Sequence, residues 1–274
     1  MERLSPTAKQ QALLLTAFGT SIPEAYATYE KMAKQFAEAF PEKEIRWAFT
    51  SAIVRKKWKN RGKDIHSPAT ALAQLADEGY KVVSVQSLHV IHGFEYHDIL
   101  QTAKALEGLP KGIEKINVGE PLLSRHEDYQ RLCEIIQKHA QSFRQSGEAL
   151  LLMGHGTSHP GNIAYAGLQE YFRQTDPSIF VATIEAYPAI EDIIPQIRKA
   201  GINTVWLMPL LTTAGDHVLK DMAGDQEKSW RSTLSKAGFK VKIHPTPLGE
   251  MRDIVQMWID KVMTPQDKSR GTLA

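Results

Sequence analysis

The chain has 274 residues, and its 33 Lys and Arg residues nearly balance its 31 Asp and Glu residues, which leaves a formal net charge of +2. This balance excludes the basic character of proteins that bind nucleic acid or membrane surfaces through their overall charge, so an anionic ligand would need a local patch. The length is sufficient for two α/β domains, each with its own core.

The sequence has no feature of an exported or membrane-spanning protein. Its first residues, MERLSPTAKQQ, lack the apolar segment of a secretory signal, and no stretch approaches the roughly 18 apolar residues that span a bilayer. The single Cys133 excludes an internal disulfide and a thiolate metal cage, and its helical spacing with Tyr129 and Ile136 predicts a place in the core. We therefore expect a cytoplasmic protein without membrane contact.

Short apolar, β-branched runs alternate with segments of helical periodicity along the chain. The predicted strands lie near 11–18, 44–50, 81–89, 115–119, 148–154, 179–185, 203–211 and 239–244. Ser67 and Pro68 predict the start of a helix, and Gly79 predicts its end. The apolar spacing from Ile254 to Val262 predicts a last amphipathic helix. This alternation is typical of βαβ units with parallel sheets.

An internal repeat divides the chain into two similar halves. The stretch ALLLTAFGTS at 12–21 returns as ALLLMGHGTS at 149–158, with Phe18 in the place of His155. Two shorter matches follow in the same order, GYKVVSVQSL with GINTVWLMPL and EPLL with TPLG. We expect two Rossmann-like domains, 1–128 and 129–274, each with a four-stranded parallel sheet flanked by helices, and a cleft between them. The last helix, at about 250–263, is able to pack back on the N-terminal half.

Three successive strands of the second half end at residues that can bind a metal ion. His155 follows ALLLMG, Glu185 follows FVATI, and His217 lies just beyond WLMPLLTTAGD. Because parallel strands end at one edge of a sheet, where ligands bind in such folds, these three side chains are expected to converge. Two imidazoles and a carboxylate suit a borderline divalent ion such as cobalt, nickel, iron or zinc. The alternative is that each residue is a polar strand cap or a loop histidine.

The first half carries a denser cluster, SLHVIHGFEYHD at 87–98, with His89, His92, Glu95 and His97. Its spacing matches no fixed metal-binding signature. Aligning Gly93 with Gly215 puts Glu95 opposite His217 in the repeat and in the first turn of a helix, where the helix dipole favours a carboxylate. Glu95 is therefore the site candidate of this cluster, whereas structural or solvated roles are expected for His89 and His97.

A basic run, VRKKWKNRGK at 54–63, follows the second predicted strand. Such a run is usually a solvated helix face, but near the expected cleft it would attract a polyanionic ligand. A packing role is expected for Trp58. Nucleic acid is excluded as a partner because the rest of the chain is neither basic nor rich in recognition motifs.

Motifs for nucleotide binding and serine hydrolysis are absent. The sequence has no G-x-x-x-x-G-K-[ST], no G-x-G-x-x-G and no G-x-S-x-G. A phosphohydrolase or phosphomutase with His155 as nucleophile is a further alternative. Such an enzyme would need arginines for the phosphate, and Gly154 stands where these families have Arg.

Several segments together resemble the anaerobic sirohydrochlorin cobaltochelatases, the class II chelatases of cobalamin synthesis. They are LLLTAFGTS, RWAFTSAIVRKK, VQSLHVIHGFEYHD, GEPLLSRHEDY, LLMGHGTSHP, IEAYP and MPLLTTAGDHVLKDMAGDQEKSW. The resemblance implies two Rossmann-like halves that bind a tetrapyrrole between them, with Co²⁺ and sirohydrochlorin or precorrin-2 as substrates. It implies no nucleotide and no cofactor besides the metal substrate, and it favours a homo-oligomer.

The resemblance also assigns roles to the candidate residues. His155 and His217 match the family's active-site histidines, and Glu95 and Glu185 fall where relatives have acidic residues. A neutral imidazole, with an ordinary pKa of about 6.5, can accept a proton and can hold a metal ion. We expect His155 to accept pyrrole protons and to bind the metal with His217 and Glu185, while Glu95 holds the ion or relays protons from the opposite wall.

The chain differs from its relatives at Phe94 and His97, where acidic residues can occur. Two alternatives stay open from the sequence. One is a chelatase that inserts iron or nickel into a related tetrapyrrole, and the other is a non-enzymatic carrier of a tetrapyrrole or a metal ion.

Overall fold

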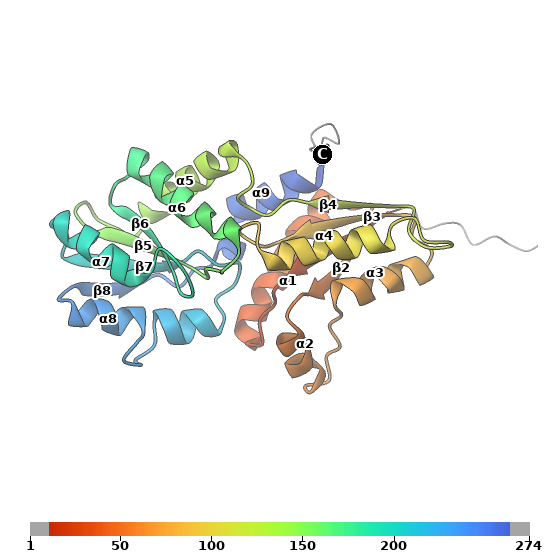
Figure 1. Cartoon of the computed structure of the whole chain (residues 1–274), viewed down its shortest axis with the longest axis horizontal. Helices are drawn as coiled ribbons and strands as arrows, with labels where there is room; N and C mark the ends of the chain where they lie inside the picture. Colours follow the sequence, from red (N-terminus) through yellow and green to blue (C-terminus); the bar gives the residue numbers. More distant parts are fainter. Residues whose placement is uncertain (1–10, 264–274) are drawn as a thin grey trace, which may run out of the picture.

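The computed structural model describes residues 11–263, which form two α/β halves side by side (Figure 1). The first half contains β1 (Gln11–Ala17), α1 (Pro23–Ala39), β2 (Glu44–Phe49), α2 (Ala52–Lys59), α3 (Pro68–Asp77), β3 (Val82–Ser87), α4 (Phe94–Leu106) and β4 (Lys115–Gly119). After α5 (His126–Ala140) come β5 (Ala149–Gly154), η1 (Pro160–Asn162), α6 (Ile163–Thr175), β6 (Ile179–Thr183), α7 (Ile190–Lys199), β7 (Thr204–Pro209), η2 (Val218–Met222), α8 (Trp230–Lys236), β8 (Lys240–Ile243), η3 (Leu248–Glu250) and α9 (Arg252–Met263).

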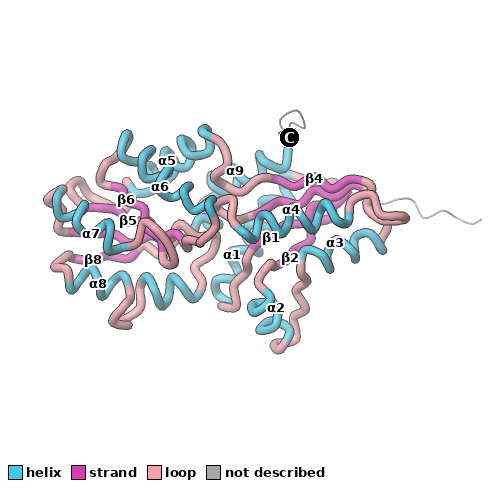
Figure 2. The backbone as a smooth tube through the Cα atoms, in the orientation of Figure 1, coloured by secondary structure: helices cyan, strands magenta, loops and turns pink. Residues whose placement is uncertain are grey.

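The two sheets have the same topology, as the repeat predicts. Their strand orders are β2-β1-β3-β4 and β6-β5-β7-β8, and every pairing is parallel. Figure 2 shows the strands of both halves in magenta with helices in cyan around them. The predicted two-domain α/β fold with four-stranded parallel sheets is confirmed. The strands β1 and β5 are apolar over nearly their whole length because helices cover both faces of each sheet.

Local signals place the helices as the sequence predicts. At the start of α3, the side chain of Ser67 accepts a hydrogen bond from the backbone N–H of Thr70, and Pro68 occupies the first helical position. Cys133 is buried in α5, and burial raises the pKa of its thiol to about 12, which fits the predicted core position.

The two halves exchange helices. Helix α5, which follows β4, packs against α6 of the second half, whereas α9, which follows β8, packs against α1, β3 and β4 of the first half. Where α5 and α9 meet, Lys261 Nζ lies 2.7 Å from Asp128 Oδ2, and Arg131 Nη1 lies 2.6 Å from Asp260 Oδ2. A domain boundary at 128 falls in the first turn of α5 and stays a prediction.

Within residues 11–263, the helices are too short or too polar to cross a lipid bilayer.

Candidate metal-binding and catalytic site

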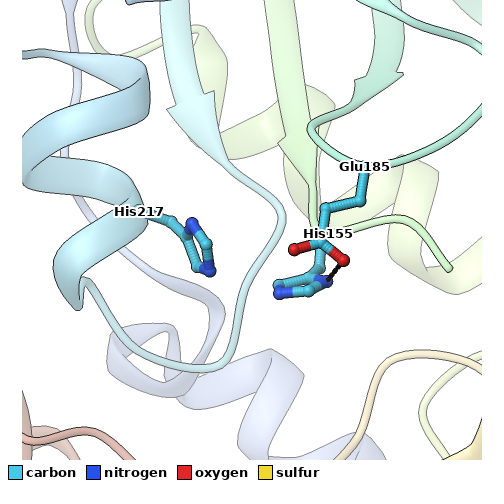
Figure 3. A group of neighbouring side chains, drawn as sticks. All are labelled: His155, Glu185 and His217. Carbon is cyan, nitrogen blue, oxygen red and sulfur yellow. Dashed lines mark ion pairs between the residues drawn. The ribbon is translucent and has the colours of Figure 1, made fainter.

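The structure brings His155, Glu185 and His217 together, as expected from the strand ends. His155 directly follows β5, Glu185 lies two residues after β6, and His217 immediately precedes η2. Each residue offers a ligand atom, and these atoms all lie within 4.8 Å of one another. Figure 3 shows the three side chains turned toward a common point. We call these three residues the metal triad.

Hydrogen bonding fixes which nitrogen of His155 is available. Its Nδ1 lies 2.9 Å from the carbonyl oxygen of Gly156, and a carbonyl can only accept, so Nδ1 carries the proton. Glu185 Oε2 lies 3.6 Å from the same nitrogen. In the neutral ring the lone pair is therefore on Nε2, which can bind a metal ion or accept a proton.

His217 is oriented in the same way by a residue that sequence reasoning missed. Its Nδ1 lies 2.6 Å from Asp221 Oδ2. The Nδ1–H group donates to this carboxylate, which leaves the Nε2 lone pair free. A carboxylate behind a metal-binding histidine typically fixes its tautomer and raises its basicity. The i,i+4 spacing of His217 and Asp221 was the available signal.

The metal triad is accessible to solvent, and among residues 11–263 it offers three ligands. The exposed fraction is 37% for the side chains of His155 and His217 and 55% for that of Glu185. The two imidazole rings are almost perpendicular, with centroids 4.8 Å apart. Three protein ligands leave positions for water or for an incoming ligand, which is the arrangement of exchangeable rather than structural metal sites.

A glycine turn after β5 makes this geometry possible. Gly156 has φ of 83°, and a Cβ there would lie 2.8 Å from the Cβ of Thr183. Its repeat partner Gly19 has φ of 97°, and a Cβ there would lie 2.5 Å from the ring of Phe49. The GTS of both repeats is therefore scaffold, since it lets the chain turn tightly beside the neighbouring strand.

The opposite wall of the site comes from the first half. The ring of Phe18, 46% exposed, has its centroid 6.3 Å from that of His155. Hydrogen bonding joins the halves close by, because Thr212 Oγ1 donates to the carbonyl oxygen of Leu88 over 2.8 Å. The second half thus supplies polar ligands, and the first half supplies an apolar ring.

The His-rich cluster of the first half is not part of the triad. Glu95 is half-buried in the first turn of α4, and its role in handling the metal stays a prediction. His89 hydrogen-bonds Ser87 through Nδ1, and burial lowers its pKa to about 4. His92 hydrogen-bonds Ser124 over 2.8 Å.

His97 and His159 connect the two halves, with their Nδ1 and Nε2 atoms 3.1 Å apart. His159 Nδ1 accepts from the backbone N–H of Gly161, so its Nε2–H donates to His97. His159 has no free lone pair in this arrangement, which favours a structural role for the pair.

The basic run packs around the end of β1. Arg61 donates to the carbonyl oxygen of Ser21, and the indole N–H of Trp58 donates to that of Thr20. Trp58 is buried, so its expected packing role is confirmed. Lys57 Nζ lies 3.4 Å from Ser21 Oγ. The pKa of Asp216 is lowered chiefly by the hydrogen bond from Lys220, and the charge of Lys57 also contributes. Positive charge therefore acts beside the metal triad.

Two cavities lie elsewhere in the molecule. One of about 110 Å³ lies between α5 and α9, and one of about 260 Å³ lies between α3 and α4. Neither is lined by the triad.

Comparison with known proteins gives a consistent result. Residues 11–266 match a family described as cobalt chelatase (CbiK). The chain is 36% identical over 255 residues to a sirohydrochlorin cobaltochelatase of Salmonella typhimurium, covering 91% of this chain and 94% of that protein. It is 34% identical over 251 residues to sirohydrochlorin cobaltochelatase CbiKC of Nitratidesulfovibrio vulgaris, covering 92% and 89%.

Solved structures share the fold at lower identity. SirB from Bacillus subtilis with Fe³⁺ superposes with a TM-score of 0.65 at 14% identity, covering 93% of this chain and 94% of that chain. CbiX, described as the terminal enzyme for siroheme biosynthesis in denitrifying bacteria, gives 0.55 at 18% identity, covering 93% and 98%.

Proposed function

Since this chain belongs to the cobalt chelatase (CbiK) family, we propose that it inserts Co²⁺ into sirohydrochlorin, or into precorrin-2, during anaerobic cobalamin synthesis. The observation that carries the proposal is the metal triad, in which ligand atoms of His155, Glu185 and His217 lie within 4.8 Å of one another. Both histidines carry their proton on Nδ1 and keep the Nε2 lone pair free. The names of relatives 34% and 36% identical to this chain support the choice of metal and tetrapyrrole.

The reaction exchanges protons for metal. A dication that enters the macrocycle displaces two pyrrole protons and loses its previous ligands. The lone pair on His155 Nε2 can hold either the metal or a proton, but not both at once. We therefore infer that His155 releases the metal as a pyrrole nitrogen takes its place, and then accepts one of the two pyrrole protons. The second proton passes to the Glu95 carboxylate of the opposite wall or to solvent water. Metal transfer and proton removal are coupled at this one atom.

The other two ligands keep the ion in place during this exchange. His217, oriented by Asp221, and the Glu185 carboxylate hold the metal while its bond to His155 is replaced. The high exposure of Glu185 lets its carboxylate move with the ion. A closed four-ligand cage would be a poor metal donor, whereas a three-ligand open site allows ligand exchange.

Charge and shape support an anionic, flat substrate. The exposed ring of Phe18 offers an apolar surface for one face of the macrocycle, opposite the metal triad. Lys56, Lys57 and Lys59 lie in the last turn of α2, which flanks the same wall. Their positive charge complements the peripheral carboxylates of sirohydrochlorin. The proposed reaction needs no nucleotide and no cofactor besides the metal substrate.

Glu95 is the proposed carboxylate of the first half, where it would hold the ion or relay protons from the opposite wall. The comparison of Glu185→Gln with Glu95→Gln tests this division. We expect Glu185→Gln to weaken Co²⁺ binding in the absence of tetrapyrrole and Glu95→Gln to slow insertion. The reverse pattern would mean that the carboxylates are assigned to the wrong walls. A cytoplasmic location and a homo-oligomeric state stay predictions.

An insertion assay tests the proposal. The protein is incubated with sirohydrochlorin and Co²⁺ without oxygen, and the absorbance change of the macrocycle is followed. We expect a rate well above the uncatalysed reaction, lost in His155→Ala and retained in His126→Ala, a control histidine on the exposed side of α5. Tight binding of the tetrapyrrole without acceleration would indicate a carrier. Faster insertion of Fe²⁺ or Ni²⁺ than of Co²⁺ would indicate the other chelatase reaction.

A further inference from the structure

A second pair of facing histidines lies outside the metal triad. His139, in the last turn of α5, and His244, which follows β8, have their Nε2 atoms 2.8 Å apart. They are 105 residues apart in the sequence. Both side chains are half-buried.

This pair is well separated from the proposed reaction site. His244 packs beside Phe143, which in turn packs against Trp206. Trp206 is the register partner of Leu150, near the start of β5, whereas His155 follows the end of that strand. Five residues of strand correspond to roughly 16 Å at about 3.3 Å per residue. A ligand at the pair would therefore not contact the triad.

Aromatic packing holds both rings in place. Phe143 stacks on His244, with centroids 3.9 Å apart and planes 10° from parallel, and meets His139 edge-on at 5.7 Å. The backbone N–H of His244 also donates to the carbonyl oxygen of Leu207. The two nitrogens are therefore brought together by residues that fix each ring independently.

The surrounding charges leave the imidazoles as the available ligands. Burial lowers the pKa of His139, and burial together with the charge of His139 lowers the pKa of His244. The nearby Lys242 is neutralised by Glu148, at 2.7 Å, and the other oxygen of Glu148 accepts from the indole of Trp206. That carboxylate is fully engaged, and the lowered pKa values favour the neutral form of both rings. In the hydrogen bond between the rings one Nε2 donates and the other accepts, so binding of a metal ion by both Nε2 atoms requires the donor ring to carry its proton on Nδ1 instead.

We propose that His139 and His244 bind a second borderline divalent transition-metal ion, with two imidazole ligands and water completing the coordination. The observed 2.8 Å separation is close to the roughly 2.9 Å between adjacent ligands of an octahedral ion with bonds of about 2.0–2.1 Å. Imidazole suits Co²⁺, Ni²⁺, Cu²⁺ and Zn²⁺ rather than Mg²⁺ or Ca²⁺. Two protein ligands make this site weaker than the triad.

Co²⁺ binding without tetrapyrrole tests the proposal independently of chelatase activity. The variant His155→Ala/His217→Ala, which lacks two ligands of the triad, is titrated calorimetrically with CoCl₂. We expect one remaining site per chain, whose affinity falls at least tenfold when His139→Gln or His244→Gln is added. His126→Gln, on the same helix as His139, is the matched control and should leave that affinity unchanged.

Trp206 provides a second readout in the protein with all its histidines. A Co²⁺ or Cu²⁺ ion at the pair should quench its fluorescence, and Trp206→Phe should remove that part of the quenching. This fluorescence measurement tests metal binding at the pair even if a histidine variant fails to fold. The proposal would be overturned if Co²⁺ affinity were equal with and without His139 and His244, or if Trp206→Phe left the quenching unchanged. In that case the two histidines would form only a hydrogen bond.

Discussion

Phe18 and His155 occupy the same position of the internal repeat, and their rings face each other across the two halves with centroids 6.3 Å apart. Both follow a buried strand, and both precede a left-handed glycine that packs against the neighbouring strand end. The fold is therefore duplicated while the chemistry is not. One wall offers an apolar ring, and the other offers a metal ligand.

This asymmetry predicts that Phe18→Ala weakens tetrapyrrole binding without affecting the metal. Because Phe18 is 46% exposed in the free protein, it can contact the macrocycle, and we expect the loss of this contact to cost about 1 kcal/mol, or about a fivefold rise in KM. Co²⁺ affinity, measured by calorimetry, should stay unchanged. If Co²⁺ affinity fell and KM did not, Phe18 would support the triad rather than the substrate.

Asp221 is predicted to act as a positioning residue through His217. In Asp221→Asn the ring loses its carboxylate partner, so Co²⁺ affinity should fall about 10–100-fold, as is typical when such partners of metal ligands are removed. Asp221→Glu should restore part of it. Asp225→Asn is the control, because Asp225 pairs with Arg231 on an exposed surface. Equal loss in both variants would point to a general charge effect.

The buried His89 is expected to make the free energy of unfolding sensitive to acid. Burial lowers its pKa to about 4, so between pH 6.5 and 4 the unfolded chain binds a proton that the folded chain does not. The free energy of unfolding should therefore decrease on acidification, by about 2 kcal/mol between pH 7 and pH 5 from this residue. Urea unfolding at both pH values measures the loss, which should be smaller in His89→Gln. An equal loss in that variant would assign the sensitivity to other groups.

Gly156 is predicted to be essential for the geometry of the site. Substitution of Gly79 by Ala is the matched control for substitution of Gly156 by Ala. Both have positive φ, but a Cβ at Gly79 meets nothing within 4 Å, whereas one at Gly156 meets Thr183 and the backbone of Ala186. Gly79→Ala should cost only the backbone strain of about 1–2 kcal/mol. Gly156→Ala should cost more in thermal unfolding and should also weaken Co²⁺ binding. Equal effects on binding would mean that the crowding at Gly156 is relieved elsewhere.

The strands and the triad were predictable because their signals are local or repeated. Apolar runs that end at glycine or a polar residue define the strands, and parallel strands necessarily end at one edge, which brings His155, Glu185 and His217 together. The hydrogen bond of His217 to Asp221 depends on side-chain rotamers that the sequence does not specify. The contact of His139 with His244 depends on how α5 docks on the second half, and no local pattern encodes that docking.

In the proposed site, the metal ion binds the Nε2 atoms of His155 and His217. A crystal of the protein soaked with Co²⁺, measured on both sides of the cobalt absorption edge, tests it most directly. We expect an anomalous peak about 2.1 Å from Nε2 of His155 and of His217, with a Glu185 oxygen as third ligand. Cobalt bound through Nδ1 of either ring, or a triad without cobalt while the ion occupies other sites, would contradict it.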